Sequence, residues 1–444
     1  MHEHLESIYH DLKLKYPYQK EYLQSVLEFF ESINNVLLED PKIIESNVIR
    51  NIVEPDRIIT FKVPWVDDKG KNRFNTGYRV QFNQALGPYK GGIRFTPNVN
   101  ESVLKFLGFE QTFKNSLTGL PLGGGKGGSD FNPKNKSDAE LLRFCQSFMI
   151  ELHRHLGPTL DVPAGDIGVS QKAIGYMFGM YKRLTHAHHG SFTGKGTNYG
   201  GSLGRTEATG YGIIYMTLAA LDKYFNTDLK NITIIISGSG NVALHTAYKA
   251  KQMGANVVAM SSIDGVIYHP QGIDVALLEH IKEHNQLIEV YLERYPNAVF
   301  SKDTKKIWEI PCEIALPCAT ENELELEDVK KLVKNGLKML VEGANMPTTL
   351  DATHYLLEHN ILFIPGKAAN AGGVSVSGLE MQQNALHTSW TFETVDNKLK
   401  EIMTKLFNSI YETAKSYDKP FDLVSGANIL SFKRIYQAML DQGL

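Results

Sequence analysis

The pattern of apolar and polar residues predicts an α/β fold whose first part extends to about residue 200. Residues 57–65 and 74–84 alternate apolar and polar side chains, as half-buried strands do. Helical periodicity covers four stretches on either side of them: residues 1–60, 101–119, 138–156 and 170–184. We expect Asn100 to cap the second of these helices. The glycine-rich residues 123–128 and residues 161–168 are interpreted as loops.

After residue 200 the pattern predicts a different architecture. Residues 194–204 are rich in Gly, Ser and Asn and are typical of a hinge. Strands and helices then alternate, which indicates a doubly wound, mostly parallel sheet. The predicted strands are Ile232–Ser237, Val257–Met260, Val299–Phe300, Glu313–Leu316, Leu337–Val341 and Ile361–Ile364. Residues 321–328 are expected to open a helix with Thr320 and Glu323 as its capping box, and residues 393–444 are expected to be helical.

Composition narrows the class of protein. The 444 residues predict two domains, and a formal net charge of -3 gives no support to nucleic-acid or polybasic membrane binding. No apolar run approaches the ~20 residues that a membrane span needs. The N-terminus does not resemble a signal peptide. The three cysteines are interpreted as reduced structural thiols, so we expect a cytoplasmic protein.

Three lysines are the first candidates for chemistry. Lys90 and Lys126 lie beside glycines, which leaves them unshielded and within reach of a small ligand, and Lys114 lies on a largely apolar helix. Three converging ammonium groups would suit a molecule with more than one carboxylate. They would also lower one another's pKa, so that one could act as a base. The alternative is that each lysine is an ordinary surface charge.

A dinucleotide site is predicted at residues 238–243. The sequence Gly-Ser-Gly-Asn-Val-Ala follows an apolar strand and opens a helix that ends near Gly254, within a βαβ unit of about 30 residues. Gly238 permits the tight turn and Gly240 the approach of a pyrophosphate, with Ser239, Asn241 and Val242 completing the loop. Ser262 and Asp264 follow the next strand, where an acid favours NAD and small or basic residues favour NADP. This signal is mixed.

These residues, taken together, resemble a known family. Lys90, Gln111, Lys114, Lys126 and three segments are similar to the hexameric glutamate dehydrogenases of bacterial type; the segments are residues 163–166, 206–210 and 370–377. The resemblance covers the whole chain. It implies a homohexamer with a substrate domain at residues 1–200, to which a C-terminal helix at 421–444 returns. It also implies a dinucleotide domain at residues 201–420, with a cleft between the two domains.

The resemblance also implies roles for individual residues. Lys90 and Ser377 would hold the side-chain carboxylate of L-glutamate, and Lys114 and Gln111 its α-carboxylate. Lys126 would polarise the carbonyl and activate water, and Asp166 would move protons to and from the amino group. Ala164, Gly165 and Val374 are assigned to the substrate site, and Thr209 and Asn370 to the cofactor site. The implied reaction is reversible deamination to 2-oxoglutarate and ammonium, with no metal.

The sequence leaves several alternatives open. The Gly238–Gly240 turn resembles that of the NADP-dependent members of the family and Lys282 is a candidate phosphate partner, but Asp264 leaves NAD as the alternative. Asp166 alone could be a turn residue, and Ser377 a hydroxyl in the first turn of a helix. A dehydrogenase of apolar amino acids would not need Lys90 and Ser377, and a binding protein without turnover would not need Lys126 and Asp166. His186, His188 and His189 are interpreted as solvated rather than as metal ligands.

Overall fold

The computed structural model describes residues 1–38, 40–188 and 190–443. These residues form two compact units. The first unit comprises Met1–Leu203, Ser377–Val395 and Asn428–Leu444, and the second comprises Gly204–Val376 and Asp396–Ala427. Within the described residues no helix is long and apolar enough to cross a membrane.

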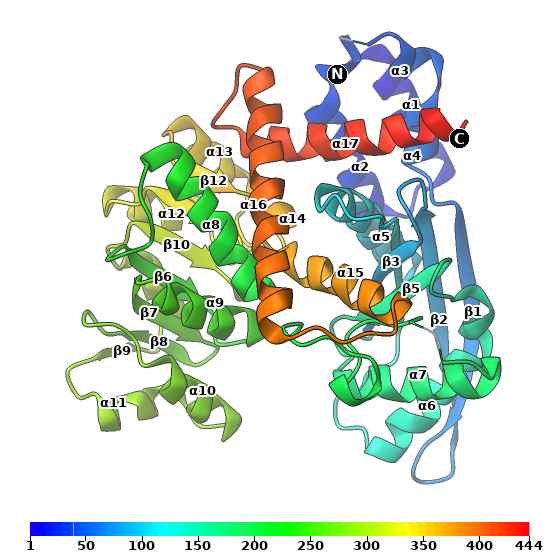
Figure 1. The fold of residues 1–444 in the computed structure, drawn as a ribbon, viewed down its shortest axis with the longest axis horizontal. Coiled ribbons are helices and arrows are strands. Elements are labelled where there is room, and N and C mark those ends of the chain that lie inside the picture. The colour runs from blue at the N-terminus through cyan, green and yellow to red at the C-terminus, as the bar shows by residue number, and fades with distance from the viewer. Residues whose placement is uncertain (39, 189, 444) are drawn as a thin grey trace. The chain divides into compact units, whose positions relative to one another are not determined.

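The first unit is built on a mixed sheet of five strands in the order β1-β2-β4-β3-β5 (Figure 1). Its strands are β1 (Arg57–Val66), β2 (Asn72–Asn83), β3 (Tyr89–Phe95), β4 (Gly124–Ser129) and β5 (Asp161–Gly165). β2 pairs antiparallel with β1 and β4, whereas β3 pairs parallel with β4 and β5. The strands predicted at residues 57–65 and 74–84 are confirmed as β1 and β2.

Three strands of this sheet were not predicted. Residues 123–128 and 161–165, expected as loops, form β4 and β5, and β3 was not expected at all. The physical reason is close packing. A Cβ atom at Gly91 would lie 1.6 Å from the Gly125 carbonyl oxygen, and one at Gly124 would lie 1.9 Å from Thr112 Oγ1. Glycine is therefore required where β3 and β4 approach each other and where β4 approaches the helix at residues 101–117, although glycine has a low strand propensity.

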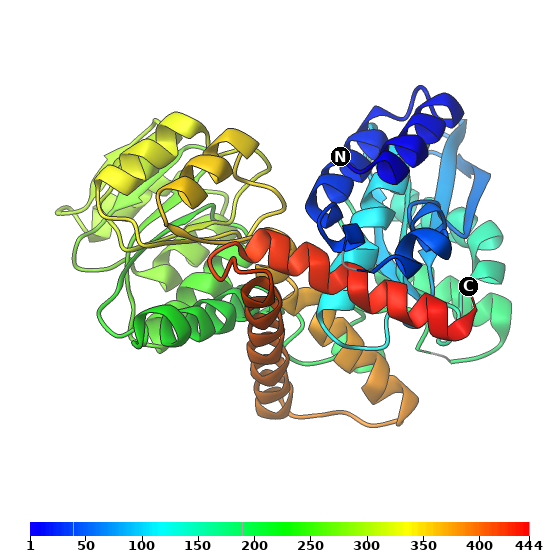
Figure 2. The ribbon, with the colours of Figure 1, turned by 90° about the horizontal axis from the view of Figure 1, so that it is seen from above.

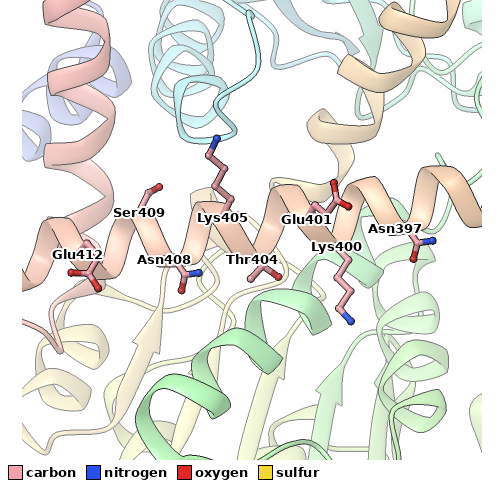
Figure 3. A pocket seen from close by; sticks show the side chains of 8 residues that line it. All are labelled: Asn397, Lys400, Glu401, Thr404, Lys405, Asn408, Ser409 and Glu412. Carbon is pink, nitrogen blue, oxygen red and sulfur yellow. The ribbon is translucent and has the colours of Figure 1, made fainter.

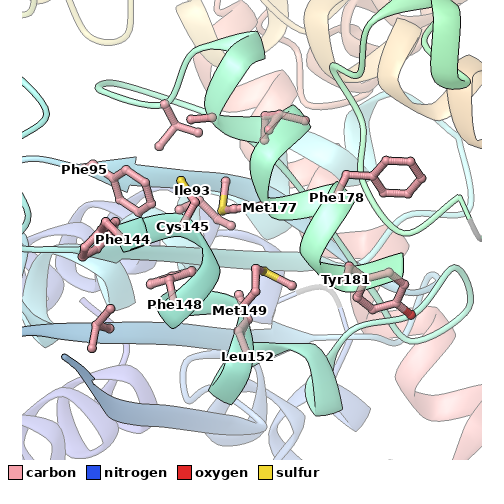
Figure 4. Close-up of a cluster of buried hydrophobic side chains, with 14 of the residues drawn as sticks. Ile93, Phe95, Phe144, Cys145, Phe148, Met149, Leu152, Met177, Phe178 and Tyr181 are labelled. Carbon is pink, nitrogen blue, oxygen red and sulfur yellow. The ribbon is translucent and has the colours of Figure 1, made fainter. Parts of the chain in front are cut away.

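Helices cover this sheet as the periodicity predicts. The structure contains α5 (Glu101–Leu117), α6 (Asp138–Leu152) and α7 (Gln171–Thr185), and Asn100 Oδ1 accepts a hydrogen bond from Val103 N, which confirms the predicted cap. α6 and α7 pack on the sheet through a cluster of buried aromatic and aliphatic side chains (Figure 4). In that cluster Phe95 of β3 contacts Phe144 of α6 edge to face, with ring centroids 5.1 Å apart.

The N-terminal helices and the last part of the C-terminal helix both belong to the first unit. The N-terminal helices are α1 (Glu3–Lys15), α2 (Lys20–Ile33), α3 (Lys42–Glu45) and α4 (Val48–Ile52). The predicted stretch 393–444 is two helices, α16 (Phe392–Ser416) and α17 (Leu423–Gln442). The end of α17 lies along the first unit (Figure 2): Arg434 donates to the carbonyls of Ser116 and Leu117 at 2.8 and 2.9 Å. This confirms the returning C-terminal helix.

The second unit contains the doubly wound sheet that the sequence predicts. Its strand order is β12-β11-β10-β6-β7-β8-β9. The strands are β6 (Thr233–Ser237), β7 (Asn256–Ser262), β8 (Gly265–Tyr268), β9 (Val299–Ser301), β10 (Ile314–Pro317), β11 (Met339–Val341) and β12 (Leu362–Ile364). All pairings are parallel except those of β8, which pairs antiparallel with β7 and β9 and was not predicted.

The helices of the second unit lie between and beside these strands. They are α8 (Ala208–Phe225), α9 (Asn241–Gln252), α10 (Val275–Glu283), α11 (Tyr291–Arg294), α12 (Leu326–Lys334), α13 (Leu350–Glu358), α14 (Gly366–Ala369), part of α15 (Gly372–Ala385) and most of α16. The predicted capping box is wrong. α12 begins after Glu325, which forms the box with Asp328, whereas Glu323 accepts a hydrogen bond from Ser237 at 2.8 Å.

Candidate active site

An ion cluster in the first unit joins one buried lysine to two partly buried partners. Lys126 of β4 places its Nζ 2.9 Å from Oδ2 of Asp166, and Arg94 Nε of β3 lies 2.9 Å from the same oxygen. Asp166 follows β5 directly, and Gly92 makes room for it, because a Cβ atom there would lie 2.8 Å from Asp166 Cβ. The parallel pairing of β3 with both β4 and β5 therefore assembles the cluster.

The cluster perturbs both ionisable partners. Burial lowers the pKa of Lys126, and Arg94 and Arg79 lower it further, while Asp166 opposes them. Burial alone would raise the pKa of Asp166, but the charges of Lys126 and Arg94 hold it well below its usual value. The result is a carboxylate that stays ionised beside an amine that loses its proton more readily than usual. A shared site with two such groups is suited to proton transfer.

The glycines beside the lysines act differently from the prediction. Lys90 and Lys126 are only 2% and 6% exposed, so the glycines do not leave them open to solvent. They allow β3, β4 and α5 to pack closely, as at Gly91 and Gly124. The lysines were also expected to lower one another's pKa. At Lys126 the main cause of the lowered pKa is instead burial, and the cations that lower it further are the two arginines, Arg94 and Arg79.

Lys90 and the predicted α-carboxylate residues are connected through one asparagine. Asn115 Nδ2 donates to the Lys90 carbonyl at 3.0 Å and to the Gly123 carbonyl at 2.6 Å. Its Oδ1 accepts from Gln111 Nε2 at 2.7 Å. Gln111 and Lys114 lie on α5 with Asn115, and Lys114 is partly buried, as predicted. The structure therefore brings the candidates of β3 and α5 together around a buried amide.

The remaining substrate-site candidates lie on β5 and α15. Ala164 and Gly165 belong to β5, paired with Gly92 and Ile93. Ser377 is buried in the second turn of α15, so the alternative interpretation as a first-turn hydroxyl is wrong. Val374 precedes it on the same helix.

The predicted dinucleotide loop has the geometry of an anion-binding turn. Gly238 has a φ of 89° and donates its N–H to Ser261 Oγ at 2.8 Å. Gly240 is the N-cap of α9, and beyond its chain neighbours no heavy atom of the described residues lies within 4 Å of a Cβ built there. No side chain caps this helix among the described residues, and Asn241 reaches instead to the Thr206 carbonyl at 2.7 Å. The N–H groups at this helix start suit a pyrophosphate.

Two further predicted cofactor residues have features that fit a nicotinamide amide. Asn370 is 5% exposed, and its Nδ2 donates to Asn345 Oδ1 at 2.8 Å. Its Oδ1 is buried and has no hydrogen-bond partner within the described chain. Such an acceptor is costly unless a ligand or water donates to it. Thr209 lies beside Gly373, where a Cβ atom would be 2.7 Å from Thr209 Oγ1. The residues present therefore fit a nicotinamide dinucleotide.

The end of β7 contains the residues that bear on cofactor choice. Ser239 Oγ donates to Ser262 Oγ at 3.3 Å. Asp264 Oδ2 accepts a hydrogen bond from Ile288 N at 2.7 Å, which ties the carboxylate to the segment after α10. Lys282 is an exposed residue of α10. The carboxylate that would oppose a 2′-phosphate is thus already engaged by a backbone donor.

Other hollows and clusters do not compete with these sites. A shallow surface hollow of about 870 Å³ follows one helix, α16, and is lined only by polar side chains (Figure 3); the residues are Asn397, Lys400, Glu401, Thr404, Lys405, Asn408, Ser409 and Glu412. The ring of His188 lies edge-on to Phe178, and His189 lies outside the described residues. Over residues 1–38, 40–188 and 190–443 no group of three His, Cys, Asp or Glu could hold a metal.

Two family models match the chain. One, described as Glutamate/Leucine/Phenylalanine/Valine dehydrogenase, matches residues 200–443. The other, described as Glu/Leu/Phe/Val dehydrogenase, dimerisation domain, matches residues 55–183. The chain belongs to this dehydrogenase family. The match over the second part of the chain begins within the Gly-rich segment at residues 194–204.

Relatives of this dehydrogenase family match over the full length. An NAD-specific glutamate dehydrogenase of Bacteroides fragilis is 51% identical over 99% of both chains. An NADP-specific glutamate dehydrogenase of Helicobacter pylori is 50% identical over 99% of this chain and all of its own. A crystal structure of Plasmodium falciparum glutamate dehydrogenase covers the whole chain with a TM-score of 0.96 and 47% identity, over 95% of its own length.

Several residues around the ion cluster of this dehydrogenase were not predicted. They are Arg94, Asn115 and the fully buried pair Arg79 and Asp161. Arg79 Nε lies 2.9 Å from Asp161 Oδ2, and the Arg79 side chain passes beside Gly127, where a Cβ atom would lie 3.1 Å from its Cδ. The sequence signal that could have identified them is the presence of polar residues in or beside glycine-rich segments. This signal indicates a site only once β3, β4 and β5 are recognised as strands.

Proposed function

We propose that the protein is an enzyme that catalyses the reversible oxidative deamination of L-glutamate to 2-oxoglutarate and ammonium with a nicotinamide dinucleotide. The observation that carries this proposal is the 2.9 Å contact of the buried Lys126 with Asp166. Lys126 lies on β4, and the neighbouring strand β3 contains a second buried lysine, Lys90. An acid–base pair and a buried cationic anchor are what deamination of an acidic amino acid requires.

Substrate binding in this proposal uses the two ends of a five-carbon dicarboxylate. Lys90 and Ser377 hold the side-chain carboxylate, and both are nearly inaccessible to water, which strengthens their interaction with an anion. Lys114 and Gln111 hold the α-carboxylate from α5. Ala164, Gly165 and Val374 line the aliphatic part of the substrate. The hydrogen bonds of Asn115 to Gln111 and to the Lys90 carbonyl support the relative placement of the two anchors.

The chemistry is assigned to the ion cluster. Lys126 polarises the carbonyl of the oxo acid and activates the attacking water, tasks favoured by its lowered pKa. Asp166 transfers the proton of the amino group and remains ionised in the resting site because Lys126 and Arg94 surround it. Arg94 contacts Asp166 rather than substrate, so we assign it as a positioning residue.

The second unit supplies the cofactor site in this proposal. Residues 238–242 hold the pyrophosphate at the start of α9, and Thr209 and Asn370 hold the nicotinamide amide, which can donate to the unpartnered Oδ1 of Asn370. The bound nicotinamide supplies hydride acceptance and donation. The proposal keeps the functional domains predicted from the sequence, residues 1–200 with 421–444 and residues 201–420, although residues 377–395 belong to the first compact unit.

For the cofactor we keep the preference for NADP, with NAD as the alternative. The support is local: the Ser239 and Ser262 hydroxyls lie at the end of β7, and Asp264 is engaged by Ile288 N. The relatives give no preference, since at 51% and 50% identity one is named NAD-specific and the other NADP-specific. Ser262 and Asp264 are therefore the residues whose roles need measurement.

We further propose a homohexamer in the cytoplasm. The family model over residues 55–183 is described as a dimerisation domain, which supports self-association. The three cysteines are buried and free, as expected where thiols remain reduced.

The direct experiment is an initial-rate assay with 2-oxoglutarate, ammonium and either NADPH or NADH. We expect turnover that depends on all three components. Activity with the oxo acids of leucine or phenylalanine but not with 2-oxoglutarate would favour the apolar amino-acid dehydrogenases of the same family. Cofactor binding without any turnover would indicate a binding protein instead.

A further inference from the structure

A further buried ion pair, which shares no residue with the Lys126 cluster, lies in the first unit. Lys195 Nζ lies 2.7 Å from Glu380 Oε1, and both side chains are inaccessible to solvent. Lys195 belongs to the loop at residues 191–195, and Glu380 belongs to α15. Burying two charges costs several kcal/mol per ion unless geometry and added hydrogen bonds offset the loss. A pair of this kind therefore invites the question of what it holds in place.

The carboxylate of Glu380 organises the backbone of the loop. Its Oε2 accepts a hydrogen bond from Gly194 N at 2.9 Å, and its Oε1 also accepts from Lys195 N at 3.4 Å. The Lys195 ammonium donates in addition to the Phe192 carbonyl. Both oxygens of the Glu380 carboxylate thus accept hydrogen bonds from consecutive residues of the loop, Gly194 and Lys195. This arrangement fixes the loop and α15 relative to each other.

The same loop is attached to the strand beside Lys90. Thr193 N donates to the Pro163 carbonyl of β5 at 3.0 Å. In the parallel register of β5 and β3, Pro163 faces Gly91 and Val162 faces Lys90. The path of contacts from Glu380 through the loop therefore ends at β5, the strand that pairs with the Lys90 strand β3.

On the other side, Glu380 lies one helical turn after Ser377. Residues three apart on a helix lie on the same side of it, and both side chains are buried. The contacts of Glu380 therefore fix the part of α15 that presents the Ser377 hydroxyl.

We infer that Glu380 and Lys195 are positioning residues for substrate selectivity, which hold the Ser377 hydroxyl at the correct separation from the Lys90 ammonium. The inference rests on the proposed function, in which these two groups bind the distal carboxylate. The pair touches neither substrate nor cofactor. It acts through the loop and β5 on one side and through α15 on the other.

The test compares two oxo acids with the same five-carbon chain. 2-Oxoglutarate carries the distal carboxylate and 2-oxopentanoate lacks it, so the ratio of their kcat/KM values reports the distal anchor alone. Glu380→Asp keeps the charge beside Lys195 but withdraws the carboxylate by one methylene. We expect this ratio to fall by at least ~10-fold, because small misplacements of a binding group are costly, while the KM for the cofactor stays unchanged.

Two further variants separate positioning from general damage. Asn384→Ala is the matched control: it removes a 2.7 Å hydrogen bond from the same helix to Gly200 O, one turn beyond Glu380, and should leave the ratio unchanged. In a Ser377→Ala background, Glu380→Asp should lower the ratio little further, because the group it positions is already absent. If Glu380→Asp does not fold, Lys195→Met with Glu380→Gln removes both charges together and is measured in its place.

The outcomes distinguish this inference from the proposed function. A parent enzyme that does not prefer 2-oxoglutarate contradicts the proposed function and this inference with it. A parent that prefers it, with an unchanged ratio in the folded Glu380→Asp or double variant, contradicts only the positioning role. A proportional loss on both oxo acids with a lower melting temperature would make the pair merely structural and would also overturn the inference.

Discussion

Lys126 Nζ and Asp166 Oδ2 lie 2.9 Å apart in a site where the lysine is almost fully buried. Neither residue is close to the other in sequence, and the contact forms because β4, β3 and β5 are neighbours in one parallel arrangement. Arg94 completes the cluster from β3. While both cations are protonated, two of them around one carboxylate give the cluster a net positive charge, which favours an anionic substrate.

The first prediction concerns Lys126 itself. Lys126→Ala removes the group proposed to polarise the carbonyl, so kcat should fall by at least ~10², as is typical for loss of an acid–base group. Cofactor affinity, measured by fluorescence titration, should be preserved. Lys71→Ala, at an exposed position in the turn before β2, is the control and should be as active as the parent. Near-normal turnover of Lys126→Ala would exclude the assigned role.

The second prediction concerns the pH dependence of the reaction. Arg94 lowers the pKa of Lys126, although burial contributes more. Arg94→Met removes a positive charge near the ammonium, so the protonated form is favoured and the pKa of Lys126 rises. The free amine then appears only at higher pH. We expect the ascending limb of the kcat profile to move to higher pH in the variant.

The same substitution also has an expected effect on the carboxyl group of Asp166. Arg94 also helps to hold the pKa of Asp166 below its usual value, so the variant should lose activity at a higher pH on the acid side as Asp166 becomes protonated. Both effects therefore move the acid side of the profile to higher pH. A profile that is only scaled down, with an unmoved acid side, would show that Arg94 does not act on the titration of either group.

The parts of the site that were predicted from the sequence depend on local sequence pattern, whereas the parts that were missed depend on how distant strands pair. The loop at Gly238 was predicted because an Ile-rich strand and a helix flank it, so local pattern and function coincide. β3, β4 and β5 were missed because glycines replace the β-branched residues that normally mark strands. Arg94 and the Arg79–Asp161 pair, 82 residues apart, follow from strand register, which periodicity does not encode.

The third prediction concerns substrate choice. Lys90 is proposed to pair with the side-chain carboxylate, and it is buried. Lys90→Leu leaves that carboxylate desolvated and unpaired, so binding of glutamate in the transition state should weaken by ~2–5 kcal/mol. Relative activity on apolar amino acids such as norvaline should rise. The measurement is kcat/KM for both substrates in parent and variant. Unchanged glutamate kinetics would mean that the distal anchor lies elsewhere.

The last prediction concerns the cofactor and depends on Asp264. Its Oδ2 accepts a hydrogen bond from Ile288 N, which fixes the orientation of the carboxylate. It still carries a charge that opposes a 2′-phosphate, at an estimated ~1–2 kcal/mol for a partly solvated site. Asp264→Ser removes the charge and should raise the preference for NADPH. Lowering the pH toward about 6 protonates the phosphate and should narrow any penalty in the parent.

The decisive measurement is the specificity constant for NADPH and for NADH in the parent and in Asp264→Ser. Glu283→Ser, a nearby exposed acid on α10, serves as the matched control for a general change of surface charge. If Asp264 only repels phosphate, the variant gains on NADPH and keeps its NADH constant. If it anchors the ribose, the parent strongly prefers NADH and the variant loses that preference. The second result would contradict the proposal of NADP and would assign the ribose hydroxyl to a remaining acceptor position of the Asp264 carboxylate.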